Sequence, residues 1–257
     1  MPGPKPGALP LGDALIILQP MSILCTTFYH TAGLFSMVQL VLMKITKYEH
    51  ACLRVEVDGR VLVIDPGVFS ASFVASDNID AVIVTHEHSD HFDSEKIATI
   101  HSFNPNVVIF TTEKVASQIS DAKVPDQDEK ITIGNFTLQF FGHDHAPIVD
   151  DVVPCDNFGV VVNDMLIYPG DSFSIPPTLA DYDPAKMVLA APVSAPWLKV
   201  DEVMKYIAAI KPARVFPMHN ALLSPNGESV FYNWLRSACD EVGVEFIDLQ
   251  PGEELSV

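Results

Sequence analysis

Three histidines and one aspartate fall within six residues, directly after a short apolar run. The apolar run covers residues 81–84, and the polar cluster reads HEHSDH over residues 86–91. A strand that ends at residue 84 would fix the backbone, and the loop after it could turn several imidazoles toward one point. Imidazole and carboxylate ligands suit a borderline divalent cation such as Zn²⁺, and diverging ligands can serve a second cation. The cluster therefore predicts a metal site at a strand end, with Glu87 pointing away between two ligands.

Residues 1–42 differ in composition from the rest of the chain. They open with the Pro- and Gly-rich run MPGPKPGALPLG, and the apolar stretch that follows is interrupted by polar residues and Pro20. This stretch falls short of a transmembrane helix and lacks the basic start and cleavage site of a secretory signal. We expect an N-terminal extension that is poorly ordered or not native, with membrane contact possible only through these residues. We expect residues 43–257 to form the functional domain.

Short β-type runs alternate with helical patterns from residue 43 onward. We expect strands at residues 44–48, 53–57, 61–64, 81–84, 107–110, 136–141, 159–162, 165–168, 187–190 and 214–216. We expect helices at residues 94–103, 112–119, 198–210 and 225–242, the last capped by Ser224 and Gly243. Asp58-Gly59 and Asn163-Asp164 are typical hairpin turns. Hairpins followed by alternating strands and helices predict sheets packed on each other, with helices outside.

Charge and cysteine content narrow the classes of partner. Lys and Arg number 15 against 33 Asp and Glu, for a net charge of −18. We expect no nucleic-acid partner, because such binding relies on Lys and Arg that displace counterions. The cysteines, Cys25, Cys52, Cys155 and Cys239, include no CxxC pair. We expect reduced thiols in a cytoplasmic protein, the alternative being two disulfides in an exported one.

The cluster at residues 86–91 resembles the HxHxDH motif of the metallo-β-lactamase superfamily, and four further segments resemble that family's other motifs in order. They read VIDPG over residues 63–67, GHDHA over 142–146, YPGDSF over 168–173 and PMHN over 217–220. Together they span residue 43 to the C-terminus. The resemblance implies an α+β fold, an αββα sandwich of two mixed β-sheets with helices on the outer faces.

The resemblance also implies two divalent metal ions, Zn²⁺ before Mn²⁺ or Fe²⁺. It assigns His86, His88 and His145 to one ion, Asp90, His91 and His219 to the other, and Asp171 to both. The resemblance also implies that Asp65, which ends the strand of the first motif, supports the metal loop without binding metal itself.

Two histidines leave alternatives open. His143 could replace His145, because side chains two residues apart on an extended chain point the same way. The residues that follow, Ala146 and Ile148, resemble the family's pattern after the ligand and favour His145. His50 resembles a histidine that lactonase-like members carry near the metal loop, so it would support the ligands or contact substrate.

The implied reaction is hydrolysis by a metal-bound hydroxide, since divalent ions lower the pKa of bound water to about 7 and polarise the scissile group. Asp90 would orient the hydroxide or accept its proton. The chain resembles the smaller branch that includes L-ascorbate-6-phosphate lactonase, so we expect a small-molecule ester or lactone as substrate. A phosphorylated substrate would need cations, and only Lys199 and Arg214 lie near the last motifs.

A phosphodiesterase of the same fold and a metal-binding, non-hydrolytic scaffold or sensor are the alternatives. The oligomeric state stays open. Trp197 either faces the substrate or packs, whereas the pair Trp234-Leu235 is expected to face the core.

Overall fold

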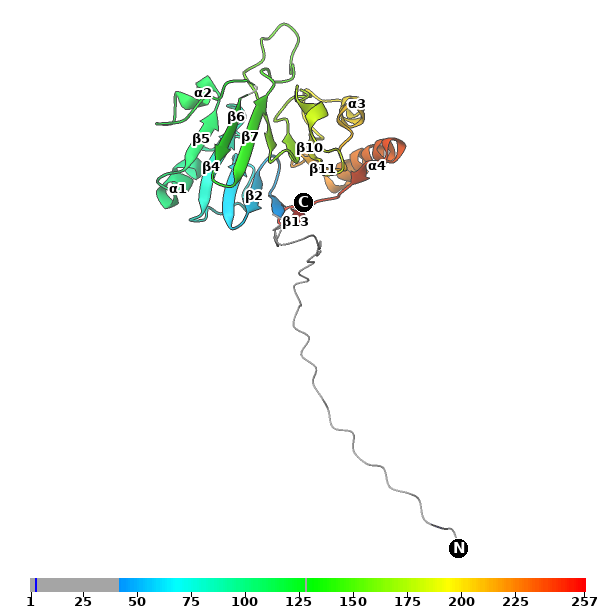
Figure 1. The fold of residues 1–257 in the computed structure, drawn as a ribbon. Helices are drawn as coiled ribbons and strands as arrows, with labels where there is room; N and C mark the ends of the chain where they lie inside the picture. The colour runs from blue at the N-terminus through cyan, green and yellow to red at the C-terminus, as the bar shows by residue number, and fades with distance from the viewer. Residues whose placement is uncertain (1–2, 4–41, 128) are drawn as a thin grey trace, which may run out of the picture. The chain divides into compact units, whose positions relative to one another are not determined.

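The computed structural model describes residue 3 and residues 42–257 except 128, and the strands of this region build two β-sheets (Figure 1). The expectations for residues 1–41, Cys25 included, lie outside the described residues. The described residues from 42 onward form one compact unit. No described helix is both long and apolar enough to cross a membrane.

The first sheet has six strands in the order β13-β1-β2-β3-β4-β5. Their bounds are Met43–Lys47 (β1), Leu53–Val57 (β2), Arg60–Ile64 (β3), Ile79–Val84 (β4), Val108–Thr111 (β5) and Glu254–Ser256 (β13). Strands β13, β1, β2 and β3 pair antiparallel, whereas β3, β4 and β5 run parallel. Asp58 and Gly59 both have positive φ, 49° and 75°. This is the backbone of a type I′ turn, which matches strand twist, so the predicted hairpin is confirmed.

The second sheet has seven strands in the order β12-β11-β10-β9-β8-β7-β6. Their bounds are Lys130–Ile133 (β6), Phe136–Phe141 (β7), Gly159–Val162 (β8), Leu166–Tyr168 (β9), Val188–Pro192 (β10), Arg214–Met218 (β11) and Glu245–Phe246 (β12). Strands β6 to β9 pair antiparallel, and β9 to β12 run parallel. Asn163 and Asp164 also have positive φ, 53° and 56°, so the second predicted hairpin is confirmed.

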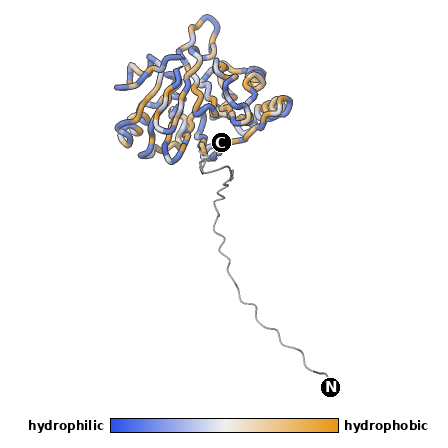
Figure 2. The backbone as a smooth tube through the Cα atoms, in the orientation of Figure 1, coloured by the Kyte–Doolittle hydropathy of each residue, from blue (hydrophilic) through white to orange (hydrophobic). Residues whose placement is uncertain are grey.

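The main core lies between the sheets, because alternate residues of each strand point inward. Side chains such as Leu62 and Ile83 of the first sheet and Phe140 and Phe216 of the second belong to one buried cluster. Apolar stretches follow the strands in Figure 2. The opposite faces pack against helices, giving the expected αββα sandwich.

The helices divide between the two outer faces (Figure 1). Helices α1 (Ser94–Phe103) and α2 (Glu113–Ala116) cover the first sheet, with Ile97, Ile100 and Val115 in its outer cluster. Helices α3 (Val200–Ile210) and α4 (Pro225–Val242) cover the second sheet. A short 3₁₀ turn, η1 (Leu179–Asp181), precedes β10.

The predicted strands and helices differ from those in the structure mainly at the edges of the sheets and at helix ends. α4 begins and ends as predicted, with the Ser224 hydroxyl accepting from Gly227 N and Gly243 at φ 74°. α2 covers only part of the predicted residues 112–119. Strands β6, β12 and β13 were not predicted, because each is short and lies at or next to a sheet edge. Trp234 is 56% exposed, so its predicted burial is wrong, while its neighbour Leu235 is buried against the sheet.

The loops that carry the predicted ligands leave their strands at one end of the sandwich. Strands β3 and β4 are parallel, and β7, β9 and β11 share one direction, so their carboxyl ends meet at one edge. Hydrogen bonds join the loops of the two sheets there. His219 N donates to His50 O over 2.8 Å, and Phe158 N donates to Thr85 O over 3.3 Å.

Candidate metal centre

Six histidines and two aspartates gather in two groups at this edge. Within each group the candidate ligand atoms lie within 4.8 Å of one another. The first group is His86, His88, His145 and Asp171, and the second is His50, Asp90, His91 and His219. The structure therefore brings together every residue that the resemblance assigned to metal, and it adds His50 to the second group.

His143 and Glu87 belong to neither group. His143 lies at the surface, where its Nδ1 is 3.1 Å from Asp144 Oδ1 of the adjacent residue. The left-handed Gly142, at φ 74°, turns the chain as it leaves β7. His145 is buried and turned inward instead.

Asp171 lies between the two groups. Its Oδ1 is 3.1 Å from His91 Nε2 in the second group, and its Oδ2 is 3.3 Å from His145 Nε2 in the first. Asn157 positions the residue by accepting from Asp171 N over 3.0 Å. Trp197 Nε1 donates to Oδ2 over 3.1 Å, so Trp197 packs at the centre and holds the shared carboxylate. Nothing in the sequence pointed to Asn157 or to this role of Trp197.

Hydrogen bonds at Nδ1 orient three of the imidazoles. His91 Nδ1 lies 2.7 Å from Asp65 Oδ2. The Nδ1 atoms of His145 and His219 lie 2.6 and 2.7 Å from backbone carbonyl oxygens. Because these partners only accept, each Nδ1 carries the proton and donates it. Each Nε2 then faces the centre, as in metal-binding histidines whose other nitrogen is held from behind.

Asp65 also supports His86, through Thr85. The Thr85 hydroxyl donates to Asp65 Oδ2 over 2.7 Å, so it accepts from His86 Nδ1 at 3.0 Å. Asp65 accepts in addition from Thr85 N and from the Tyr168 hydroxyl. One fully buried carboxylate therefore sets the ring orientation of a histidine in each group.

Several buried atoms at the centre have no hydrogen-bond partner. They are His91 Nε2, His145 Nε2, His219 Nε2 and Asp171 Oδ1. Buried polar atoms are nearly always paired, so orphaned atoms need an explanation. All four are nitrogen or carboxylate donors that face one another, which is the ligand chemistry of divalent transition metals. The residues present therefore fit two metal ions.

His88 and His50 are held differently from the other imidazoles. His88 Nδ1 lies 3.1 Å from His86 Nε2, and its Nε2 lies 3.9 Å from Cys155 Sγ, so Nδ1 is the atom that faces the first group. His50 Nδ1 accepts from Ala221 N over 3.3 Å. The proton of His50 is therefore on Nε2, which donates to Asp90 Oδ2 over 3.0 Å. His50 orients Asp90 in this arrangement and offers no lone pair to a metal.

Buried aspartates and histidines at the centre shift one another's pKa values. Burial by itself would raise the pKa of Asp171, but His91 and His219 hold it well below the usual range. Burial disfavours charge on His219, but Asp171 and Asp90 outweigh it and raise the pKa of His219 to about 9. Burial lowers the pKa of His86 and His50, which stay neutral. Metal ions would replace the histidine protons.

Comparison with known proteins identifies the family. The model of a family described as "Beta-lactamase superfamily domain" matches residues 44–219. Protein Rv0786c of Mycobacterium tuberculosis is 30% identical over 199 residues, which cover 75% of this chain and 91% of that protein. The chain belongs to the metallo-β-lactamase superfamily.

Two further similarities are to proteins named as a metal-dependent hydrolase and a metallo hydrolase. A protein of Flavobacterium johnsoniae named UPF0173 metal-dependent hydrolase is 37% identical over 81 residues, 29% of this chain and 34% of that protein. The structure of Igni18, a metallo hydrolase from Ignicoccus hospitalis, matches with a TM-score of 0.63 at 18% identity. That match covers 84% of this chain and 98% of Igni18 and shows the shared fold.

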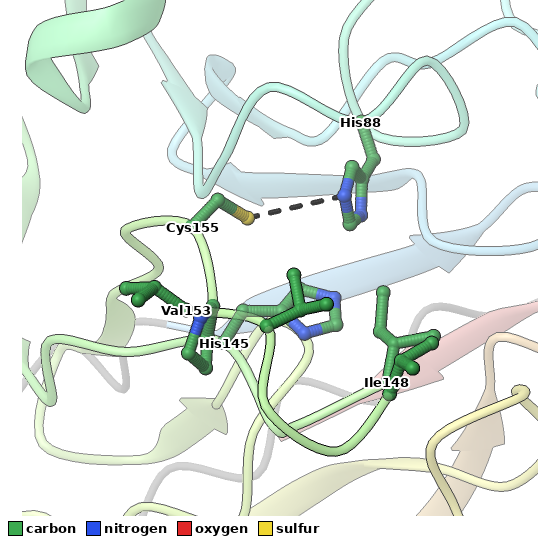
Figure 3. A pocket seen from close by; sticks show the side chains of 8 residues that line it. His88, His145, Ile148, Val153 and Cys155 are labelled. Atoms are coloured by element: carbon green, nitrogen blue, oxygen red, sulfur yellow. Dashed lines mark hydrogen bonds between the residues drawn. The ribbon is translucent and has the colours of Figure 1, made fainter.

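A hollow of ≈ 290 Å³ opens beside the first metal group (Figure 3). Two candidate ligand histidines and one segment of the loop between β7 and β8 line it. The lining residues are His88, His145, Ile148, Val149, Val152, Val153, Pro154 and Cys155. Cys52, Cys155 and Cys239 are free thiols, as expected for the described cysteines.

Proposed function

We propose that the chain is a binuclear metal-dependent hydrolase that opens an ester or lactone bond of a small molecule. The observation that carries the proposal is the pair of candidate metal groups with the Asp171 carboxylate lying between them and four buried donor atoms left unpaired. Membership of the superfamily supports metal-dependent hydrolysis as the reaction class. The site contains the residues that would bind the metal ions.

Seven residues would hold metal, and one of them, Asp90, would also contact the attacking water. His86, His88 and His145 would hold one ion, Asp90, His91 and His219 the other, and Asp171 both. The imidazole-rich set favours Zn²⁺, with Mn²⁺ or Fe²⁺ as alternatives. Two such ions, when bound, supply hydroxide at neutral pH and polarise a carbonyl.

Asp90 is the carboxylate that water and substrate can reach. Its side chain is 23% exposed, against 3% for Asp171. Burial opposes its ionisation, but His219 and His50 hold the pKa of Asp90 far below the usual range. Asp90 is therefore anionic and oriented by His50, so it would align the attacking water by accepting a hydrogen bond from it. Asp171 has its lone pairs turned into the centre.

The charges near the site favour a carbonyl substrate over a phosphodiester. The hollow is lined by no Lys or Arg. Arg214 begins β11, at the opposite end from His219, and donates to Ser256 O. Lys96 Nζ donates to Gly67 O and Ser70 Oγ, so it is already engaged. A phosphate group would find few cations other than the metals.

Metal content and turnover together test the proposal. We expect near two metal ions per chain by plasma mass spectrometry, near one in His219→Ala, and near two in His143→Ala. The last variant is the matched control, since His143 is an exposed histidine of the same loop that carries His145. We expect turnover of esters or lactones that a chelator abolishes and zinc restores. Metal-dependent turnover of phosphodiesters alone, or no turnover with two bound ions, would overturn the ester and lactone assignment.

A further inference from the structure

Exposed apolar side chains gather on one loop beside the metal centre. We call residues 147–155, which read PIVDDVVPC, the apolar loop. Ile148, Val149, Val152 and Val153 are all exposed, and Val153 is 89% exposed. Single exposed apolar residues are ordinary, but four on one short loop mark a surface that binds something. The apolar surface of this loop contrasts with the net charge of −18 of the whole chain.

The apolar loop forms the wall of the hollow, and the ligand histidines form its floor. His88 and His145 belong to the first metal group, and Ile148, Val153 and Cys155 face the same space (Figure 3). A molecule whose reactive bond lies at the metal group would place its adjoining part against these side chains. The volume of ≈ 290 Å³ suits a part of a small molecule and is small for a polymer.

Charge around the hollow disfavours an anion. Asp150 and Asp151 are exposed on the apolar loop itself, and Lys and Arg are absent from the lining. The free thiol of Cys155 is partly buried and lies in the lining of the hollow, where it behaves as a small apolar side chain. The lining of the hollow therefore offers apolar contact and no Lys or Arg that would pair with an anionic chain.

We propose that the substrate carries an uncharged apolar chain next to its ester or lactone bond, and that this chain occupies the hollow under the apolar loop. The inference rests on the proposed function for the position of the reactive bond. The contact between chain and loop is independent of turnover, so it can be measured separately.

Binding of methyl ketones tests the hollow without hydrolysis. The series from butanone to octanone has a neutral carbonyl and a growing alkyl chain. The chain has two tryptophans, and Trp234→Phe leaves Trp197 as the single reporter. The Trp197 ring centroid lies 5.7 Å from that of His145. We expect the dissociation constant of the zinc-loaded protein to fall about fourfold for each added methylene that the hollow buries.

Two valine variants localise the effect. Val153→Asp places a carboxylate in the wall, and we expect it to remove most of the chain-length dependence. Val74→Asp is the matched control, because Val74 is 78% exposed in a loop that does not line the hollow. We expect Val74→Asp to bind the ketones as the parent does. Equal affinity along the series, or equal loss in both variants, would overturn the proposal.

Turnover separates this inference from the proposed function. We expect ethyl hexanoate to have a higher kcat/KM than ethyl acetate and than the anionic monoethyl ester of adipic acid. If these esters are hydrolysed at equal rates, the hydrolase stands and the apolar subsite is wrong. If the ketones bind with the expected length dependence but no ester or lactone is hydrolysed, the subsite stands and the proposed function is wrong.

Discussion

Replacing Asp65 by Asn tests whether one buried carboxylate organises both metal groups. Oδ1 of Asp65 accepts from Thr85 N over 2.8 Å. Oδ2 accepts from Thr85 Oγ1, His91 Nδ1 and the Tyr168 hydroxyl, each over 2.7 Å. The asparagine amide keeps the shape of the carboxylate but offers only one acceptor oxygen. In its better orientation the oxygen stays with the three donors, and the amide N–H₂ group faces Thr85 N.

The cost of Asp65→Asn can be estimated from these bonds. A buried donor left without an acceptor costs about 1–3 kcal/mol. Three hydrogen bonds also lose the strengthening that a charged acceptor gives, roughly 0.5–1 kcal/mol each. We therefore expect the free energy of unfolding of the metal-free protein to fall by about 4 kcal/mol. Ring orientation of His86 and His91 depends on the same carboxylate, so zinc affinity should fall about 10–100-fold.

Urea unfolding of the metal-free protein and zinc titration against a competing chelator measure the two effects. Asp248→Asn is the control, because Asp248 makes an exposed ion pair with Arg236 and should contribute less than about 1 kcal/mol. A loss below about 1 kcal/mol in Asp65→Asn, with unchanged zinc affinity, would refute the argument that Asp65 organises the centre.

Three other perturbations follow from the structure. Gly67→Ala places a Cβ onto the backbone of Asp90, so urea unfolding should show a loss of more than about 3 kcal/mol. Zinc binding must displace the proton of His219, whose pKa is about 9, so calorimetry near pH 7.5 should detect proton release. Apparent zinc affinity should then rise up to about tenfold per pH unit below pH 9, and pH-independent affinity would contradict this.

Burial lowers the pKa of the fully buried Lys47 to about 8, against about 10.4 unfolded. Below pH 8 the buried lysine is charged and destabilises the folded state by the full amount. Above the unfolded pKa the lysine is neutral in both states, so this destabilisation disappears. As the pH is lowered from 10.5 to 7, the free energy of unfolding of the parent should therefore fall by about 3 kcal/mol relative to that of Lys47→Met. Urea unfolding at several pH values measures this difference, and a difference that stays constant with pH would contradict it.

Local sequence determined the elements and the set of ligand types. The hairpins at Asp58-Gly59 and Asn163-Asp164 and the caps of α4 depend on backbone preferences of a few residues, so they are readable without tertiary contacts. The HEHSDH cluster after β4 was equally local, because its chemistry lies within six residues. Short edge strands such as β12 were not readable, since pairing with a neighbour creates them.

Tertiary structure alone decided how the site is arranged. His143 and His145 are equivalent in an extended chain, and only the turn at Gly142 sends one to the surface and the other to the centre. The proton on His50 Nε2 is set by Ala221 N, which is 171 residues away in sequence. Asp171 reaches both groups because five strand ends and one turn meet at one edge. The spacing of these residues in the sequence does not predict the distances between them, because the distances arise only when the two sheets pack against each other over a common core.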